Sequence, residues 1–164
     1  MNNYYYKSWI DAINKFTWKN FKSWFNFAML WFSFNSYYSE KYANIEGEWN
    51  QIKQFANDNK NLYESLFSKE KTGFSNVLKE FQQTGSYGRD GVKDMRPNST
   101  KYVKFDNEHK SCEDFFRVLY QIRCNFFHGD KQPFYEEDIK LVDWAYKYFS
   151  IFWESFLNDQ EKRN

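Results

Sequence analysis

Apolar residues recur at helical spacing along most of the chain. From Trp24 onward they fall at intervals of three and four residues, which predicts one long helix with a broad apolar stripe. Further aromatic residues lie around the same helix, so we expect protein to surround it almost completely. Shorter helices are predicted near Trp49–Ala56, Leu62–Leu66 and Phe74–Phe81. Alternation with a period of two is hard to find, so strands are poorly supported.

Two strong amphipathic helices follow in the C-terminal part. One opens at Ser111, with Asp114 three residues later as a weakened capping box, and its stripe extends to Phe126. The other runs from about Glu136 to Asn158. The sequence therefore predicts an all-α, antiparallel helical bundle that forms a single domain over residues 1–164.

The helical pattern stops between these two groups of helices. The stretch contains several glycines and a proline. It also carries basic side chains, among them Arg89, Lys93, Arg96, Lys101 and Lys104. We therefore expect one long irregular loop near residues 84–110. Loops of this length are uncommon in compact domains and are usually functional or disordered. We interpret this one as a solvated, mobile insertion, with a binding loop as the alternative.

The apolar stripes are mainly aromatic. Phe, Tyr and Trp number 19, 13 and 7, which is 24% of the 164 residues, and the mean hydropathy is −0.92. Disordered chains are poor in aromatic residues, and each buried ring removes roughly 150–250 Å² from water. We therefore exclude disorder for most of the chain and expect a core of aromatic rings.

Net charge and hydropathy bear on whether the protein could coat nucleic acid or span a membrane. The net charge of +1 excludes a strongly basic nucleic-acid coat but leaves room for a local basic patch. The uncharged segment Ser23–Ser39 is shorter than the roughly 20 apolar residues of a membrane span. A buried helix is the favoured interpretation, and membrane association is the alternative. The first residues lack the order of a signal peptide, so a reducing cytoplasm is the expected location.

Two histidines and two cysteines have the types and spacing of zinc ligands: His109, Cys112, Cys124 and His128. The stretch between the cysteines is predicted as continuous helix, which at about 1.5 Å per residue separates them by about 18 Å. One tetrahedral zinc ion needs all its ligands within about 2.3 Å. We therefore expect no metal here and interpret the cysteines as small, half-buried apolar residues.

The helix that opens at Ser111 has a second apolar stripe, about 100° from the first. Its members are Phe116, Tyr120, Arg123 and Phe127. A helix that is apolar on two faces needs two partners, its own bundle and a second surface such as a neighbouring chain. We therefore predict a homodimer interface at the three aromatic residues. An arginine among rings can stack on them or bind an anion such as phosphate.

Arg123 and His128 are five residues apart, so on an ideal helix their side chains point about 140° apart. They can cooperate only if the helix ends before His128, as Gly129 indicates, or if two chains assemble the site. The alternative, from the residues alone, is a histidine that interacts with the helix dipole.

The segment Tyr120–Lys131, Y-Q-I-R-C-N-F-F-H-G-D-K, resembles the R-x(4–6)-H motif of the HEPN family. Trp31–Tyr38 is similar to the W-x-x-F-N-x-x-Y pattern in the early long helix of some bacterial members, and Asp138 before the last helix also fits. Two positions depart from the family. Cys124 stands where Asn, Asp or His often follows the arginine, and no tyrosine follows His128 as it does in toxins paired with nucleotidyltransferase antitoxins.

The resemblance implies a small, often homodimeric helical domain. Many members are metal-independent ribonucleases of toxin–antitoxin, anti-phage or RNA-processing systems. In that case His128 acts as general acid or base, Arg123 stabilises the charge of the phosphorane, and Asn125 orients His128 or the phosphate.

No cofactor is implied by the resemblance, and the implied partners are RNA, a second copy of the chain and possible pairing with an antitoxin protein. The candidate RNA-binding residues are Arg89, Lys93, Arg96 and Lys131. The alternative is a HEPN-like domain that binds nucleotide, RNA or a protein without catalysing a reaction.

Overall fold

The structure is a computed structural model, and it describes residues 18–69, 73–105, 111–128 and 135–162. These residues are mostly helical, as the sequence predicts. The helices are α2 (Trp18–Lys41), α3 (Glu48–Asp58), α4 (Lys60–Ser68), α5 (Val77–Gln82), α6 (Ser86–Asp90), α7 (Cys112–Phe127) and α8 (Glu136–Glu161). The other elements are a 3-10 turn, η2 (Phe74–Asn76), and two strands, β1 (Val92–Lys93) and β2 (Tyr102–Val103).

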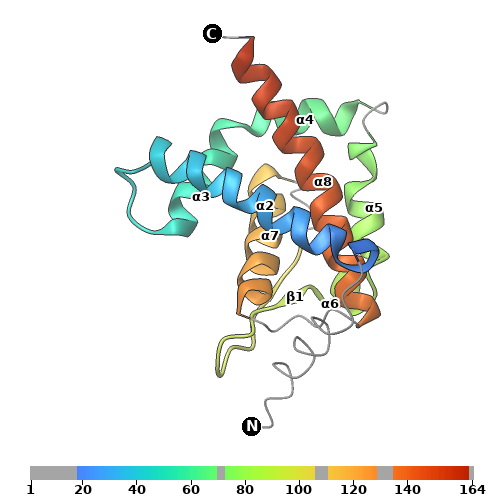
Figure 1. Ribbon diagram of the computed structural model, residues 1–164. Coiled ribbons are helices and arrows are strands. Elements are labelled where there is room, and N and C mark those ends of the chain that lie inside the picture. The colour runs from blue at the N-terminus through green and yellow to red at the C-terminus, as the bar shows by residue number, and fades with distance from the viewer. Residues whose placement is uncertain (1–17, 70–72, 106–110, 129–134, 163–164) are drawn as a thin grey trace.

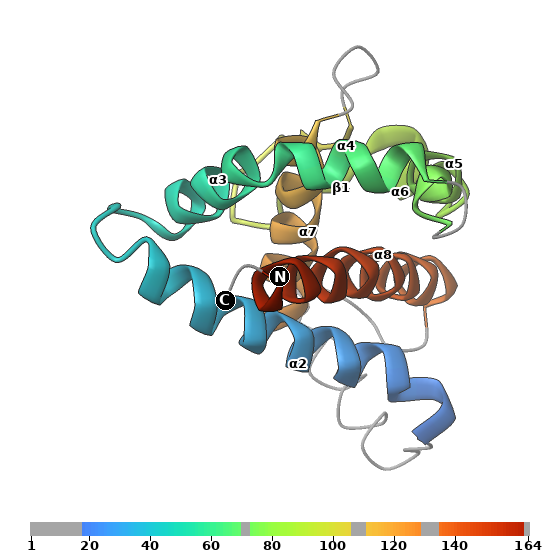
Figure 2. The ribbon, with the colours of Figure 1, turned by 90° about the horizontal axis from the view of Figure 1, so that it is seen from above.

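The long helix α8 lies between α2 and the α3–α4 pair when the molecule is seen from above (Figure 2). Helix α7 packs against α3, α4 and α8, and its C-terminal end lies beside the β1–β2 hairpin (Figure 1). The described part of the chain is therefore an all-α bundle in which α7 contacts both the helical layers and the hairpin.

The core consists mainly of aromatic rings, as expected. Phe34 of α2 is fully buried, and its ring centroid lies 4.9 Å from that of Phe55 on α3. The ring centroids of Phe116 on α7 and Phe149 on α8 each lie 5.4 Å from the ring centroid of Phe34. Most of these contacts are tilted or edge-to-face, the arrangements that aromatic quadrupoles favour. Four helices thus meet at one phenyl ring.

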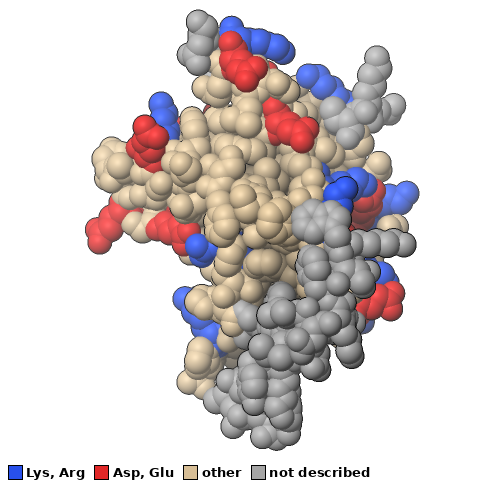
Figure 3. All heavy atoms as spheres, viewed as in Figure 1, with Lys and Arg blue, Asp and Glu red and all other residues tan. Residues whose placement is uncertain are grey.

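One face of helix α2 is partly exposed. Phe25, Met29 and Phe32 follow one another at helical spacing, and each exposes about half of its surface: 50%, 49% and 52%. The face of the molecule formed by α2 and α8 carries few charged side chains (Figure 3). The prediction that protein surrounds this helix almost completely is therefore wrong for this face. No helix in the described ranges is long and apolar enough to cross a membrane.

The stretch predicted as an irregular loop contains α6 and an antiparallel hairpin instead. Val92 pairs with Val103, and Lys93 pairs with Tyr102. Two-residue strands are too short to show alternation, so no pattern in the sequence indicates them. The hairpin is held by a contact far away in sequence, since Asn125 of α7 donates from Nδ2 to the carbonyl oxygen of Lys93 at 2.7 Å. Residues 106–110 of this stretch lie outside the described residues.

Helix α7 begins and continues as predicted. The Ser111 hydroxyl oxygen accepts a hydrogen bond from the backbone N–H of Asp114 at 3.1 Å, which caps the helix. The helix then runs unbroken past both cysteines, so the geometric objection to a shared zinc site holds for Cys112 and Cys124. His109 lies outside the described residues. Among those residues no group of three or more His, Cys, Asp or Glu is arranged to hold a metal ion.

Candidate functional site

The C-terminal end of α7 borders a cleft of about 620 Å³. Its other walls are the start of α3 and the turn that joins β1 to β2. The lining includes both motif residues, Arg123 and His128, together with Glu48 of α3 and Arg96 of the hairpin turn. The cleft therefore combines groups from three segments that are far apart in the sequence.

The guanidinium group of Arg123 is held by Glu48. Nη2 lies 3.1 Å from Oε1, and Nη1 donates to Oε2 at 3.3 Å, so the pair is bidentate. The two side chains are only 25% and 32% exposed, which limits screening by water. The sequence alone does not indicate Glu48, because an acidic residue in the first turn of a helix is common and is not a sign of a site.

Two tyrosines share the Glu48 carboxylate. The Tyr38 hydroxyl donates to Oε1 at 2.7 Å, and the Tyr120 hydroxyl donates to Oε2 at 3.2 Å. Burial, followed by the hydrogen bond to Glu48, raises the pKa of Tyr38 well above its ordinary value. Burial first, and then nearby negative charge, raises the pKa of Tyr120 as well. Both tyrosines therefore remain neutral donors, which fixes the carboxylate in front of Arg123.

Aromatic rings surround Arg123. Its Cζ lies 5.5 Å from the ring centroid of Phe127, 5.7 Å from Trp31 and 6.0 Å from Tyr120, distances typical of cation–π contacts. Tyr120 and Phe127 thus flank the arginine, as the second stripe predicts. Phe116 does not, because it is fully buried in the chain's own core and is absent from the surface.

His128 lies just beyond the last residue of α7. Its φ and ψ are −86° and 2°, and its backbone N–H still donates to the carbonyl oxygen of Cys124 at 3.1 Å. The side chain is exposed and lines the same cleft as Arg123. Helix α7 therefore ends before His128, which is one of the two conditions under which Arg123 and His128 are expected to cooperate.

Asn125 is almost fully buried and has a structural contact at each end of its amide. Nδ2 donates to Lys93, and Oδ1 accepts from Nε2 of Gln121 at 2.9 Å. The first bond holds the hairpin against α7, and the second, within α7, fixes the orientation of the amide. A catalytic role for Asn125 stays a prediction. Cys124 is half-buried at the cleft, with its Sγ 3.9 Å from Nη1 of Arg123.

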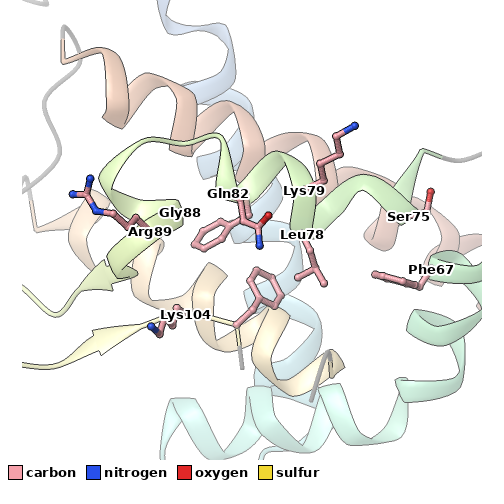
Figure 4. Close-up of a pocket in the computed structure, with 10 residues that line it drawn as sticks. Phe67, Ser75, Leu78, Lys79, Gln82, Gly88, Arg89 and Lys104 are labelled. Atoms are coloured by element: carbon pink, nitrogen blue, oxygen red, sulfur yellow. The ribbon is translucent and has the colours of Figure 1, made fainter. Parts of the chain in front are cut away.

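The candidate RNA-binding residues do not gather in one place. Arg96 lines the cleft, whereas Arg89 lines a second cavity of about 610 Å³ between α5, α6 and the chain after β2. Arg89 and Phe67 lie at opposite ends of that cavity (Figure 4). Lys93 is exposed on β1, and Lys131 lies outside the described residues. Of the described candidates, only Arg96 lines the cleft that contains Arg123 and His128.

No family model matches the chain, and neither a curated protein nor a solved structure shows a significant match to it. The likeness to HEPN domains therefore rests on the motif residues themselves.

Proposed function

We propose that this protein is a metal-independent endoribonuclease of HEPN type whose active site is the Arg123–His128 cleft. The observation that carries the proposal is that both motif residues line one cleft, with His128 exposed. On an ideal helix the two side chains would diverge by about 140°. In the folded chain both side chains nevertheless line one cleft, so the proposal places the scissile phosphate group in that cleft between them.

The proposed reaction is an internal transesterification of RNA. The 2′-oxygen attacks the adjacent phosphorus, the bond to the 5′-oxygen breaks, and the products carry a 2′,3′-cyclic phosphate and a 5′-hydroxyl. His128 removes the proton of the 2′-hydroxyl or donates one to the leaving oxygen, since imidazole exchanges protons near neutral pH. Arg123 has five N–H donors, of which Nε is buried and two others face Glu48. In the proposed reaction the remaining Nη1 and Nη2 donors stabilise the charge that develops on the phosphorane.

A second copy of the chain would supply the second acid–base group. The exposed apolar face of α2 supports this part of the proposal, because it continues into the site. The rings of Phe32 and Phe127 lie 5.7 Å apart, and both side chains are about half exposed. Phe127 in turn packs against Arg123. A partner that covers these rings would bring two Arg–His pairs together.

The second candidate is a domain that binds RNA or nucleotide without cleaving it. The bidentate contact between Arg123 and Glu48 favours this alternative, because two of the donors that would hold the transition state already face a carboxylate. In an enzyme, this carboxylate must yield to the phosphate or leave the remaining donors free to bind it.

Cleavage of RNA in excess EDTA tests the proposal. We expect R123A and H128A each to lose at least about a hundredfold in rate, the usual effect of removing an acid–base group or a charge stabiliser. The matched controls are R117A, on the same helix but paired with Glu113 outside the cleft, and H109A, the only other histidine. Full activity of R123A and H128A would overturn the proposal.

The resemblance extends the proposal to a role as a toxin or in phage defence. We expect expression of the wild-type chain to arrest bacterial growth and expression of H128A not to do so. Equal toxicity of the two chains would count against this role.

A further inference from the structure

The hairpin turn is built around one buried carboxylate. Asp94 follows β1 and is 3% exposed. It accepts hydrogen bonds from Nε of Arg96 at 2.9 and 3.0 Å, from Nη2 of Arg96 at 2.6 Å and from the Ser99 hydroxyl at 2.9 Å. Its own backbone N–H donates to the carbonyl oxygen of Lys101 at 2.9 Å. The conformation of the turn is therefore tied to the position of this side chain.

These bonds fix an exposed cation at the cleft. The Arg96 side chain is 78% exposed although its guanidinium is bound to buried Asp94. Two of its five N–H groups face the carboxylate, which leaves the Nη1 edge for a ligand. A free surface arginine loses side-chain entropy when it binds a phosphate. Arg96 has already lost much of it, because Asp94 holds its guanidinium in place.

The hairpin is also fixed relative to the proposed catalytic residues. Asn125, two residues after Arg123, bonds to the carbonyl of Lys93, the residue before Asp94. The two guanidinium groups in the cleft, one on the hairpin and one on α7, are therefore connected through a short path of backbone and hydrogen bonds.

We propose that Arg96 forms a second phosphate subsite beside Arg123 and His128, so that the preferred substrate is a polynucleotide strand rather than a mononucleotide. This inference rests on the proposed function for the identity of the scissile site. A strand offers the cleft a neighbouring phosphate to bind while the scissile phosphate is cleaved, which a mononucleotide cannot do.

Arg89 provides a matched control. It too is an exposed arginine paired with a sequence neighbour, since its Nη2 lies 2.8 Å from Oδ2 of Asp90, and it is 75% exposed. However, it lies on α6 and lines the other cavity. R89Q and R96Q remove the same charge from side chains of similar exposure, although Asp90 is half exposed and Asp94 is buried. Only Arg96 faces the cleft.

Fluorescence anisotropy with a labelled 2′-O-methyl oligonucleotide, which lacks the attacking hydroxyl, measures the subsite directly. We expect R96Q to bind about tenfold more weakly than wild type, the usual loss for one charge-assisted hydrogen-bonded contact. In a plot of log K against the logarithm of the salt concentration, the slope for R96Q should be smaller in magnitude by about 0.7 than the slope for wild type. R89Q should stay within about twofold of wild type. Equal losses in the two variants, or no loss in R96Q, would overturn the subsite.

The D94N variant distinguishes two reasons why Arg96 would bind a phosphate: that Asp94 holds its guanidinium in place, or that positive charge alone attracts the strand. The substitution raises the net charge by one, so charge alone predicts tighter binding. We expect weaker binding, because Arg96 is no longer held by a carboxylate. Tighter binding would overturn preorganisation, and wild-type affinity for 5′-AMP equal to that for the oligonucleotide would overturn the preference for a strand.

The binding affinities measured in this way do not depend on catalysis, because the 2′-O-methyl oligonucleotide cannot be cleaved. If R123A and H128A cleave RNA normally while R96Q alone loses binding, the proposed function fails and the phosphate subsite stands. If those two variants are inactive and R96Q binds like R89Q, the subsite fails and the proposed function stands.

Discussion

The two sides of α7 differ in what their residues need from the rest of the chain. On the core side, Phe116 and Ile122 are fully buried among apolar neighbours. On the cleft side, Arg123 and Asn125 have polar atoms whose partners are particular groups on α3 and the hairpin. Core residues depend on volume and shape, whereas cleft residues depend on the identity of single atoms.

This difference separates stability from function along one helix. A core substitution should affect the free energy of unfolding far more than ligand binding. A cleft substitution should do the reverse, unless it leaves a partly buried charge without its partner. The predictions below compare the two sides.

Phe116→Ala should have the largest effect on stability. It removes a ring packed against Phe34, Phe55 and Phe152, and such truncations cost about 3–5 kcal/mol. Tyr120→Phe, on the cleft side, removes one hydrogen bond and should cost about 1 kcal/mol or less. Urea denaturation followed by circular dichroism measures both values. Equal losses would erase the contrast between the two sides.

Glu48→Gln should have an intermediate effect. It removes the charge that faces Arg123 and weakens the acceptor of two tyrosines, so we expect a loss of about 1–3 kcal/mol in the free energy of unfolding. It should also tighten the binding of inorganic phosphate, because the guanidinium no longer faces a carboxylate.

Glu113→Gln is the control for this change. Glu113 pairs with Arg117 and Lys53 on the surface, where such pairs contribute about 0–1 kcal/mol. If Glu113→Gln lowers the free energy of unfolding as much as Glu48→Gln does, the Arg123–Glu48 pair contributes no more to stability than an ordinary surface pair.

The two cysteines of α7 offer a chemical comparison of its two sides. Burial strongly raises the pKa of Cys112, so its thiol should react slowly with iodoacetamide. Cys124 is half-buried at the cleft and should be alkylated at least about tenfold faster in the native protein. Mass spectrometry of time points distinguishes the two sites. Faster labelling of Cys112 would mean that the core side opens more readily than the cleft.

The smallest expected effect concerns the pH dependence of the hairpin. Hydrogen bonds from Arg96 hold the pKa of Asp94 below its ordinary value near 3.8. Its contribution to stability is therefore fully present above about pH 4 and is lost as the pH falls through the lower, folded-state pKa. Wild type should be more stable than D94N at pH 7, with a gap that narrows below pH 4 in acid titrations of unfolding. A gap that stays constant with pH would show that the charge of Asp94 contributes nothing.

Most of the helices could be predicted from the sequence, because periodicity and capping are local. The cap at Ser111 and the stripe after it determine α7 within one segment. The broad apolar arc of α7 does not show by itself which of its residues face the core. Residue spacing places Phe116 on an outer face, yet it is buried because α7 packs against helices on several sides.

The site was predictable only in part. Arg123 and His128 lie close together in the sequence and form a motif, so they could be found without a structure. Glu48 and Asp94 could not, because each gains its role from a partner that only the fold or a tight turn brings near. The same holds for the hairpin, whose position depends on the side chain of Asn125.

The most direct test of the central claim uses a DNA oligonucleotide with a single internal ribonucleotide, incubated with the protein in excess EDTA. We predict one cut on the 3′ side of that ribose, with a 2′,3′-cyclic phosphate on one product, a 5′-hydroxyl on the other, and no cut by H128A. Cleavage of the all-DNA strand, or a product with a free 3′-hydroxyl, would contradict a site in which Arg123 and His128 promote attack by a 2′-hydroxyl.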